Sequence, residues 1–441
     1  MAYRSFETSP LSRRALLRGG ALFAASITAF AALPASRAFA HGQHWPSVLA
    51  AVEEYVSSGK VANMVATMGF GQDAPDMIAR GTLALGGSTP AGMDTLYRIY
   101  SQTKPITGIA AMMLVEDGAM KLDQPVADFI PGFAKMMVQK RYDGSIGPEN
   151  LEPAAQPVTV RMLMTHTAGL GYGIVQKGPL TKAYEEAGLV PGQVSRLPIP
   201  GLGRAKPTDS LEKFADGIAA LPLVYQPGTK WSYSVGLDVL GRVIEVASGV
   251  PFDTFLEQRL FKPCGMDSTY FRVPASEVGR LTTNYGILNG TSLPIDMAAS
   301  SIYLDEPAFP FGGAGLVSSP RDYDRFQRML VGRGMIDGTR VMDAATVDLA
   351  TGDLLPGGAD LTGTWVAGQR FGAGGRVTGK AFGWGGAAGT SAFVEMETGL
   401  RAANFTQYMP AEAYGIQREF PELVMKDLAA LQAGVVIPDA A

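Results

Sequence analysis

Cysteine and histidine are the residues that this sequence of 441 residues uses least. The single cysteine, Cys264, excludes an intrachain disulfide, and because no histidine lies near it in sequence we expect a buried structural thiol rather than a nucleophile. His41 and His44 stand close to the N-terminus, which leaves His166 as the only interior histidine. A zinc site that needs two or three histidine ligands is therefore not expected, and neither a metal nor an organic cofactor is assigned.

Long basic tracts and the sequence Gly-x-Ser-x-Gly are absent as well. The formal net charge is −4 and no basic run exceeds a few positions, so nucleic acid is not an expected partner. The Gly-x-Ser-x-Gly motif carries the nucleophile of α/β-hydrolases, and a Ser-His-Asp triad in this chain would depend on His166 alone. A catalytic serine must therefore be sought in another pattern.

A hydrophobic run long enough to span a membrane is also missing. The apolar stretch at residues 21–33 falls short of the ~20 residues that a membrane-spanning helix needs. It follows a twin-arginine segment at residues 12–17 and precedes Ala38-Phe39-Ala40, which fits a cleavage site with small residues. We expect residues 1–40 to be a signal peptide cleaved after Ala40, with a periplasmic or secreted product and no stable membrane span. The alternative is a retained N-terminal anchor.

Three Ser-x-x-Lys sequences are present, at residues 57–60, 101–104 and 210–213. A serine and a lysine three positions apart on a helix face the same way, so the lysine can take the proton of the serine hydroxyl. Ser57 falls at the end of a predicted helix, and Ser210 suits the N-cap of another. Ser101 instead begins a helix of mostly apolar residues, where free N–H groups and the helix dipole favour a developing negative charge. The context therefore favours Ser101 as the nucleophile and Lys104 as its base.

Hydrophobic periodicity predicts strands near both ends of the chain and helices between them. The expected strands are 61–70, 78–85, 381–384, 391–396 and 402–406, and the expected helices are 46–59, 101–117, 210–221, 237–247, 251–261, 319–331 and 421–432. Residues 139–157 suggest a surface loop, and the long segment 186–209 suggests either a lid or a plain surface excursion. We expect an α/β (α+β) fold in which an antiparallel sheet flanked by helices holds an inserted all-helical part, with the site between them. The α/β part covers about 46–105 and 335–435, and the helical part about 106–334.

An activated serine also needs a second proton-handling group and an oxyanion hole. Tyr233 lies on a predicted turn before a helix, where it could face the site and pass a proton to the leaving group; the alternative is a buried packing tyrosine. The glycine-rich segment 383–390 could bring a backbone N–H close to that of Ser101, or it could be an ordinary turn.

Five segments in order resemble the fold shared by serine β-lactamases and penicillin-binding proteins. The resemblance covers about residues 46–410. In its pattern, this part of the chain is similar to class C β-lactamases, D-alanyl-D-alanine carboxypeptidases and family VIII carboxylesterases. The segments that carry it are Tyr100-Ser101-Gln102-Thr103-Lys104-Pro105, residues 163–170, Pro227-Gly228-Thr229-Lys230-Trp231-Ser232-Tyr233-Ser234, residues 312–316 and Trp384-Gly385-Gly386. The resemblance implies a β-lactamase/transpeptidase-like fold.

The resemblance also implies residue roles. Ser101 matches the acylated nucleophile, Lys104 its partner base and Tyr233 the tyrosine of the family's Tyr-x-Asn element. Trp384-Gly385-Gly386 matches the Lys-Thr-Gly strand, and Ala387 the residue whose N–H completes the oxyanion hole with that of Ser101. In this pattern His166 belongs to a structural segment near the site. Which of Lys104 and Tyr233 is the base in each half-reaction stays open, since coupled groups share their titration.

Two departures from the family pattern bear on the substrate. Val235 stands where many members carry an asparagine that holds a substrate amide, and Trp384 where they carry a lysine that holds a carboxylate. Residues 377–380 offer a competing match to the Lys-Thr-Gly strand, but Gly389-Thr390 follow Trp384 as the family pattern expects. A site without these polar groups suits neutral esters.

We therefore expect a serine esterase with Val235, Trp384, Gly385, Gly386 and candidate wall residue Tyr172 lining its site. The expected partner is a small-molecule ester, and the oligomeric state is not readable from the sequence. The alternatives are an acyltransferase, a β-lactamase or D-alanyl-D-alanine carboxypeptidase, and a catalytically silent relative that binds cell wall.

Overall fold

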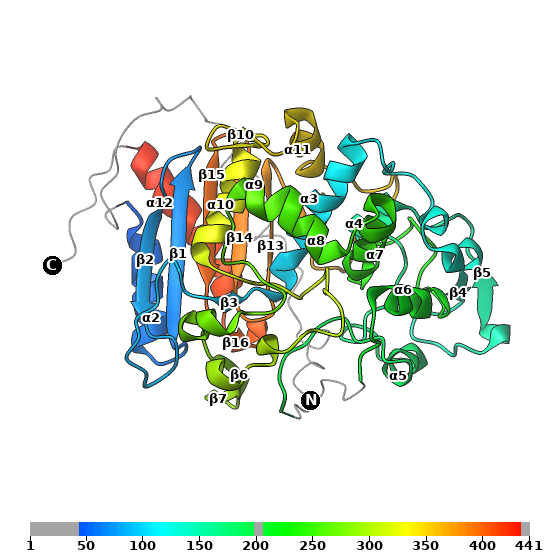
Figure 1. Cartoon of the computed structure of the whole chain (residues 1–441), viewed down its shortest axis with the longest axis horizontal. Coiled ribbons are helices and arrows are strands. Elements are labelled where there is room, and N and C mark those ends of the chain that lie inside the picture. Colours follow the sequence, from blue (N-terminus) through cyan, green and yellow to red (C-terminus); the bar gives the residue numbers. More distant parts are fainter. Residues whose placement is uncertain (1–43, 198–205, 434–441) are drawn as a thin grey trace.

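The computed structural model describes residues 44–197 and 206–433, and a seven-stranded antiparallel sheet forms its central layer (Figure 1). The strand order is β11-β12-β13-β14-β15-β1-β2, so strands from the two ends of the chain pair with each other. This arrangement confirms the predicted fold class. The strands are β1 Asn63–Phe70, β2 Asp76–Gly81, β11 Arg370–Phe371, β12 Arg376–Thr378, β13 Ala381–Gly385, β14 Ser391–Glu395 and β15 Leu400–Phe405.

Side chains of β1 alternate between the two faces of this sheet, as the pleat of a strand requires. Met64 and Met68 join an apolar cluster with buried residues of α2 (Pro46–Ser57) and α12 (Ile416–Gln432), the two helices that pack on that face. Val65, between them, belongs instead to the larger apolar cluster on the opposite side. The sheet is therefore buried on both faces, which explains why β1 is apolar along nearly its whole length.

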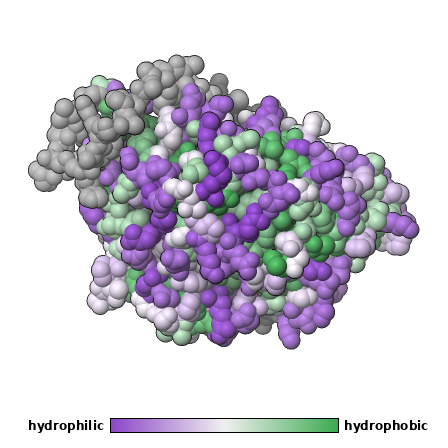
Figure 2. Space-filling view, turned by 45° about the horizontal axis from the view of Figure 1, so that its top comes forward, coloured by the Kyte–Doolittle hydropathy of each residue, from purple (hydrophilic) through white to green (hydrophobic). Residues whose placement is uncertain are grey.

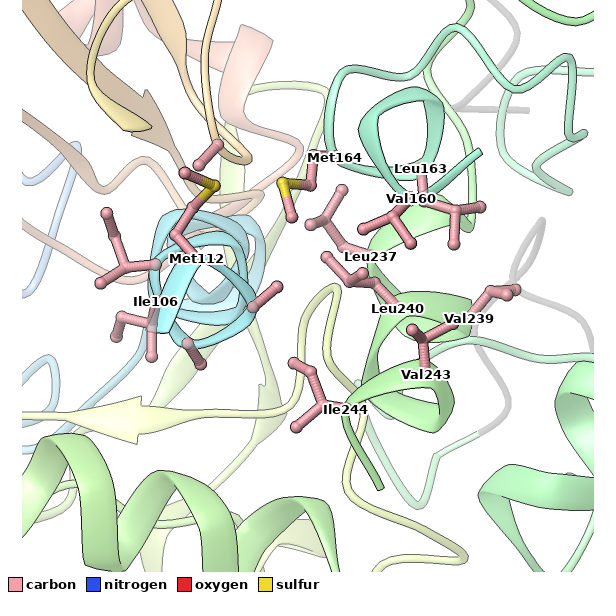
Figure 3. Packing of buried hydrophobic residues seen from close by; sticks show 14 of the residues in the cluster. Ile106, Met112, Val160, Leu163, Met164, Leu237, Val239, Leu240, Val243 and Ile244 are labelled. Carbon is pink, nitrogen blue, oxygen red and sulfur yellow. The ribbon is translucent and has the colours of Figure 1, made fainter. Parts of the chain in front are cut away.

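A helical part lies beside the sheet, and its core forms between two long helices, α3 (Thr103–Glu116) and α7 (Gly236–Ser248). Figure 3 shows Met164 and Leu240 among the side chains that fill the space between these helices. Complete burial of such a side chain stabilises a fold by about 1.5–3 kcal/mol. The neighbouring helices are α4 Val160–Met164, α5 Pro179–Glu186, α6 Leu211–Ala219, α8 Phe252–Leu256, α9 Lys262–Cys264 and α11 Ala344–Ala350.

One helix within residues 106–334, the range expected for the helical part, packs on the sheet instead. The helix α10 (Pro320–Val331) lies against β14, β15 and β1. Its N-cap, Ser319, accepts a hydrogen bond from the Asp322 N–H at 3.1 Å, so the helix begins where the sequence predicts. The helix covers the face of the sheet opposite α2 and α12.

Two helices begin more than one residue away from their predicted starts. The segment expected to be helical from residue 101 opens with a 3-10 turn, Tyr100–Gln102, before α3. The last helix begins at Ile416 rather than at Pro421, which lies inside it. A proline inside a helix removes one hydrogen bond, at about 3 kcal/mol. Burial of Phe420 and Val424 against the sheet offsets that loss.

Several short strands were not predicted. The expected surface loop 139–157 contains β5, which pairs with β4 at the start of the loop. A second hairpin is formed by β6 and β7, and β6 also pairs with β16. Their sequences lack a clear apolar alternation, and half of the residues of β7 are exposed. The bounds are β3 Tyr97–Arg98, β4 Met137–Gln139, β5 Leu151–Pro153, β6 Asn284–Leu288, β7 Thr291–Asp296, β8 Val317–Ser318, β9 Met335–Ile336, β10 Thr339–Arg340 and β16 Tyr408–Met409.

The outer face seen in Figure 2 is mostly hydrophilic, with hydrophobic residues in small separate groups. The predicted signal peptide, residues 1–40, lies outside the described residues. So does the stretch 198–205 of the segment 186–209, which was expected to be either a lid or a plain surface excursion.

Candidate active site

Ser101 lies in the 3-10 turn that leads into α3, directly after a residue with unusual backbone geometry. Tyr100 has a φ of 43°, in the left-handed region that non-glycine residues seldom adopt. Its side chain is held by an edge-to-face contact with Tyr303 at 6.4 Å and by Asn284, whose amide donates to its hydroxyl at 3.1 Å. Such a backbone typically costs about 1–3 kcal/mol and persists where surrounding contacts enforce it. The buried Tyr100 side chain therefore helps to set the direction of the Ser101 backbone.

Two proton-handling groups converge on the Ser101 hydroxyl. The Tyr233 hydroxyl donates to Ser101 Oγ at 2.8 Å, and Lys104 Nζ donates to the same oxygen at 3.3 Å. Lys104 is fully buried, and its Nζ lies 4.7 Å from the centre of the Tyr233 ring. The structure thus brings together the three residues predicted as catalytic, although Ser101 and Tyr233 are 132 positions apart along the chain. Their catalytic roles stay predictions.

The other two Ser-x-x-Lys sequences are structural. Ser57 is exposed at the end of α2, and Lys60 pairs with Glu54 at 2.7 Å. Ser210 is the N-cap of α6 and accepts a hydrogen bond from the Lys213 N–H at 3.1 Å. Both match the expectation that they cap or end helices.

The glycine-rich end of β13 approaches the Ser101 segment closely. A Cβ at Gly386 would lie 2.2 Å from the Ile99 carbonyl oxygen, and one at Gly385 would lie 2.9 Å from Gln417 Nε2. The Gly386 N–H donates to the Thr390 carbonyl at 2.8 Å, which closes the turn that carries Ala387. The turn that carries the half-buried Ala387 therefore begins beside Ile99, two residues before Ser101, and the oxyanion role of Ala387 stays a prediction.

Aromatic rings surround the Tyr233 side chain. The ring centres of Tyr172 and Trp384 lie 5.4 Å and 5.8 Å away, so both rings lie beside Tyr233, and their role in lining the substrate site stays a prediction. Trp384 Nε1 donates to the Tyr233 hydroxyl at 3.5 Å, a long hydrogen bond. Val235, the N-cap of α7, is fully buried and presents no polar side-chain group.

Trp365 is an aromatic site residue that the sequence reasoning missed. Its ring centre lies 5.0 Å from that of Tyr233 and 6.1 Å from that of Trp231. Its side chain is 47% exposed, so it lies at the outer rim of the group of rings. The only signal in the sequence is a large aromatic residue within a glycine-rich loop.

His166 has a structural position, in agreement with the prediction. It is fully buried, and its ring centre lies 4.7 Å from that of Tyr233. The Ser234 N–H donates to His166 Nδ1 at 3.2 Å, so the proton of the neutral ring resides on Nε2. Burial, with a contribution from the positive charge of Lys104, lowers the pKa of His166 well below its usual value. The ring is therefore neutral and orients Ser234, next to Tyr233 in the chain.

A buried carboxyl group, Asp238, is the second residue that the sequence reasoning missed. Its Oδ1 accepts from the Gly313 N–H at 2.8 Å, and the Gly313 carbonyl accepts from Lys104 Nζ at 2.7 Å. Burial raises the pKa of Asp238 to about 6, although the Lys104 charge and the Gly313 N–H act in the opposite direction. An acidic residue in the first turn of a helix ordinarily complements the helix dipole, so the sequence carries no separate signal for this position.

A cavity of about 830 Å³ elsewhere on the molecule is lined by none of these residues. It lies beside α6 and α8, and the ion pairs of Arg242 with Glu212 and of Arg272 with Glu306 line it. No group of three or more potential metal ligands occurs among residues 44–197 and 206–433.

The segment that carries this serine, lysine and tyrosine and the glycine-rich strand matches a known protein family. The model of the Beta-lactamase family matches residues 51–420 of this chain. The chain belongs to the beta-lactamase family. The resemblance read from the sequence is thereby confirmed.

Individual proteins are also similar to this chain. An uncharacterized protein of Mycobacterium tuberculosis is 36% identical over 267 residues, which cover 60% of this chain and 61% of that protein. Esterase EstB of Burkholderia gladioli is 31% identical over 277 residues, covering 59% and 63% of the two chains. The matched stretches thus span less than two thirds of either relative. The solved structure of EstCE1, a hydrolase with promiscuous acyltransferase activity, aligns with a TM-score of 0.70 at 23% identity over 88% of this chain and 98% of that chain.

Proposed function

We propose that this chain is a serine esterase that works through an acyl-enzyme on Ser101. The observation that carries the proposal is the convergence of Tyr233 and Lys104 on Ser101 Oγ, at 2.8 Å and 3.3 Å. A serine hydroxyl is a weak nucleophile until an adjacent group takes its proton, and these distances lie within hydrogen-bond reach. Membership of the beta-lactamase family and the similarity to esterase EstB support the same reading.

In the proposed reaction, Ser101 Oγ attacks the ester carbonyl carbon while its proton passes to the pair formed by Lys104 and Tyr233. The N–H groups of Ser101 and Ala387 stabilise the resulting oxyanion. As the tetrahedral intermediate collapses, the bond to the alcohol breaks and Tyr233 returns the proton to the leaving oxygen. Water then attacks the acyl-enzyme and gives a proton to the same pair. The pair returns that proton to Ser101 Oγ as the bond to the acyl group breaks and the carboxylic acid leaves.

Neutral esters are the proposed substrate class. The rings of Tyr172, Trp365 and Trp384 lie 5.0–5.8 Å from that of Tyr233, and Val235 offers no amide. A charge-assisted hydrogen bond to a substrate carboxylate is typically worth about 1.5–3 kcal/mol, or about tenfold to a hundredfold in binding. The absence of a lysine at position 384 therefore disfavours anionic β-lactams relative to neutral esters.

Acyl transfer is the second candidate, because the same acyl-enzyme could react with an alcohol in place of water. The structural neighbour EstCE1, described as a hydrolase with promiscuous acyltransferase activity, favours including it. Only the acceptor differs between the two reactions. Product analysis with and without an added alcohol separates them.

A panel of p-nitrophenyl esters and a chromogenic cephalosporin tests the proposal. We expect hydrolysis of short-chain esters by the wild type, loss of that activity in Ser101→Ala and much slower turnover of the cephalosporin. Intact-mass measurement after treatment with a fluorophosphonate should show one adduct on the wild type and none on the variant. Cephalosporin turnover at the rate of the esters would contradict the preference for esters, and an adduct on Ser101→Ala would show that another serine is the nucleophile.

We also propose that the protein is exported. The support is the twin-arginine segment at residues 12–17 and the cleavage pattern before His41. In residues 44–197 and 206–433, no helix combines the length and apolar character that crossing a membrane requires. N-terminal sequencing of the protein from a periplasmic fraction should begin at His41, and retention of the full chain in the cytoplasm would contradict export.

A further inference from the structure

A short relay of hydrogen bonds behind the nucleophile fixes the position of Lys104. Its Nζ donates to the Gly313 carbonyl at 2.7 Å, closer than its 3.3 Å hydrogen bond to Ser101 Oγ. The Gly313 carbonyl therefore determines where the ammonium group lies relative to the serine hydroxyl. Anything that holds this carbonyl in place also holds Lys104.

Two side chains secure the peptide group between Gly312 and Gly313. The Thr107 hydroxyl donates to the Gly312 carbonyl at 2.7 Å, and Asp238 Oδ1 accepts from the Gly313 N–H at 2.8 Å. Thr107 comes from α3 and Asp238 from α7, so the peptide is held between the two long helices of the helical part. All the polar atoms of that peptide group are thereby occupied.

The packing around this peptide group leaves no room for a side chain. A Cβ at Gly313 would lie 2.5 Å from Asp238 Oδ2, and a Cβ at Gly312 would lie 2.5 Å from the Leu237 carbonyl oxygen. The two glycines therefore permit the backbone to approach α7 closely enough for Asp238 to reach it. The close approach of this backbone to α7 therefore requires glycine at both positions.

We infer that Asp238 is a positioning residue, which orients Lys104 for proton transfer through the Gly313 peptide and supplies the opposite charge in its surroundings. Among the described residues, Asp238 makes its hydrogen bond to Gly313 and none to Ser101, so it acts through the lysine. A buried carboxyl group is an unfavourable choice for packing alone, because leaving water disfavours its charge. Burial indeed raises the pKa of Asp238, and the Lys104 charge counteracts that rise.

The test measures how fast a fluorophosphonate labels Ser101 in the wild type, Asp238→Asn, Asp238→Ala and Thr107→Val. Asparagine retains an acceptor for the Gly313 N–H but not the charge, whereas alanine removes both. We expect labelling to slow about threefold to tenfold in Asp238→Asn and about a hundredfold in Asp238→Ala, with Thr107→Val between them. For ester turnover we expect these losses in kcat, with KM changed less than about twofold.

A matched control separates positioning from stability. Asp322→Asn removes another buried carboxyl charge, one that accepts from the Ser268 N–H and the Thr269 hydroxyl at the start of α10. We expect this variant to label at the wild-type rate even if its melting temperature falls. The rates are normalised to the folded fraction measured by circular dichroism. Asp238→Asn and Thr107→Val are close to isosteric, so they keep the test informative if Asp238→Ala fails to fold.

Labelling of Asp238→Ala within about threefold of the wild-type rate would overturn the inference, as would equal slowing in Asp322→Asn. The inference rests on the proposed function only for its ester assay. Labelling without ester turnover in the wild type would reject the esterase and leave the positioning test intact. If the wild type takes no label, crystal structures decide: Lys104 Nζ must leave the Gly313 carbonyl in Asp238→Ala, and an unchanged contact rejects the inference.

Discussion

Gly386 and Ile99 lie so close that a Cβ on the glycine would overlap the carbonyl oxygen of the isoleucine. Ile99 stands two residues before the nucleophile, and Gly386 directly precedes the proposed oxyanion donor Ala387. The contact therefore sets the distance between the two N–H groups that are proposed to hold the oxyanion. Neither residue has a reactive side chain, yet their separation determines whether the hole can form.

Gly386→Ala should reduce ester hydrolysis about a hundredfold, because the added methyl group pushes the end of β13 away from the Ser101 turn. The measurement is kcat/KM for a short-chain ester, with circular dichroism to confirm folding. Gly279→Ala is the matched control, since nothing lies within 4 Å of the position that its new methyl group would occupy. Full activity in Gly386→Ala would show that this contact does not shape the site.

Tyr233→Phe should lower kcat by about a hundredfold to ten-thousandfold while KM and the fold are retained. The change removes the hydroxyl that donates to Ser101 Oγ at 2.8 Å and leaves the ring among its aromatic neighbours. Tyr55→Phe, which removes a hydroxyl bonded to Glu419 on α12, serves as the control and should retain activity. An active Tyr233→Phe would leave Lys104 as the sole proton-transfer group.

Much of this site could be predicted because its parts are local sequence patterns. Ser101 and Lys104 are one helical turn apart, and the glycines at 385 and 386 indicate a close backbone approach. The strands β13, β14 and β15 were predictable for a related reason: each is a short apolar run bounded by turn residues.

The residues that could not be predicted act through tertiary contacts. Asp238 resembles any acidic residue in the first turn of a helix until Gly313, 75 positions away, is placed beside it. Trp365 acquires meaning only from its 5.0 Å approach to Tyr233. The last helix was predicted too short because a proline usually ends a helix, whereas here burial of Phe420 sustains it.

The buried His166 should make the fold less stable as the pH falls below about 6.5. Its pKa is lowered in the folded state, so the unfolded chain binds more protons below that pH, and stability is lost as the pH decreases. This group should therefore lower the free energy of unfolding progressively as the pH falls from about 6.5. Asp238 has the opposite effect: its raised pKa of about 6 gives stability that is present below about pH 4 and lost as the pH rises through 6.

Because these two effects oppose each other, the comparison must be made between variants. His166→Asn should show a smaller loss of stability from about pH 6.5 to pH 5 than the wild type, measured by urea unfolding at each pH. Ser57→Ala, which changes an exposed side chain at the end of α2 and no titratable group, is the control and should follow the wild-type pH dependence. Identical slopes for His166→Asn and the wild type would contradict a neutral, buried histidine.

Trp365→Ala should change which esters the protein prefers more than it changes the chemistry. The ring is 47% exposed at the rim of the aromatic group around Tyr233, so it can stack on a substrate without contacting Ser101 Oγ. An aromatic pair is worth about 0.5–1.5 kcal/mol beyond area burial, so KM for an aromatic ester should rise about twofold to tenfold. For the acetate of a small alcohol, which has no aromatic ring, Trp365→Ala should have a kcat/KM within about twofold of the wild-type value. Trp365→Phe retains an aromatic ring and should restore most of the preference, whereas equal losses for both esters would place Trp365 outside the substrate-binding surface.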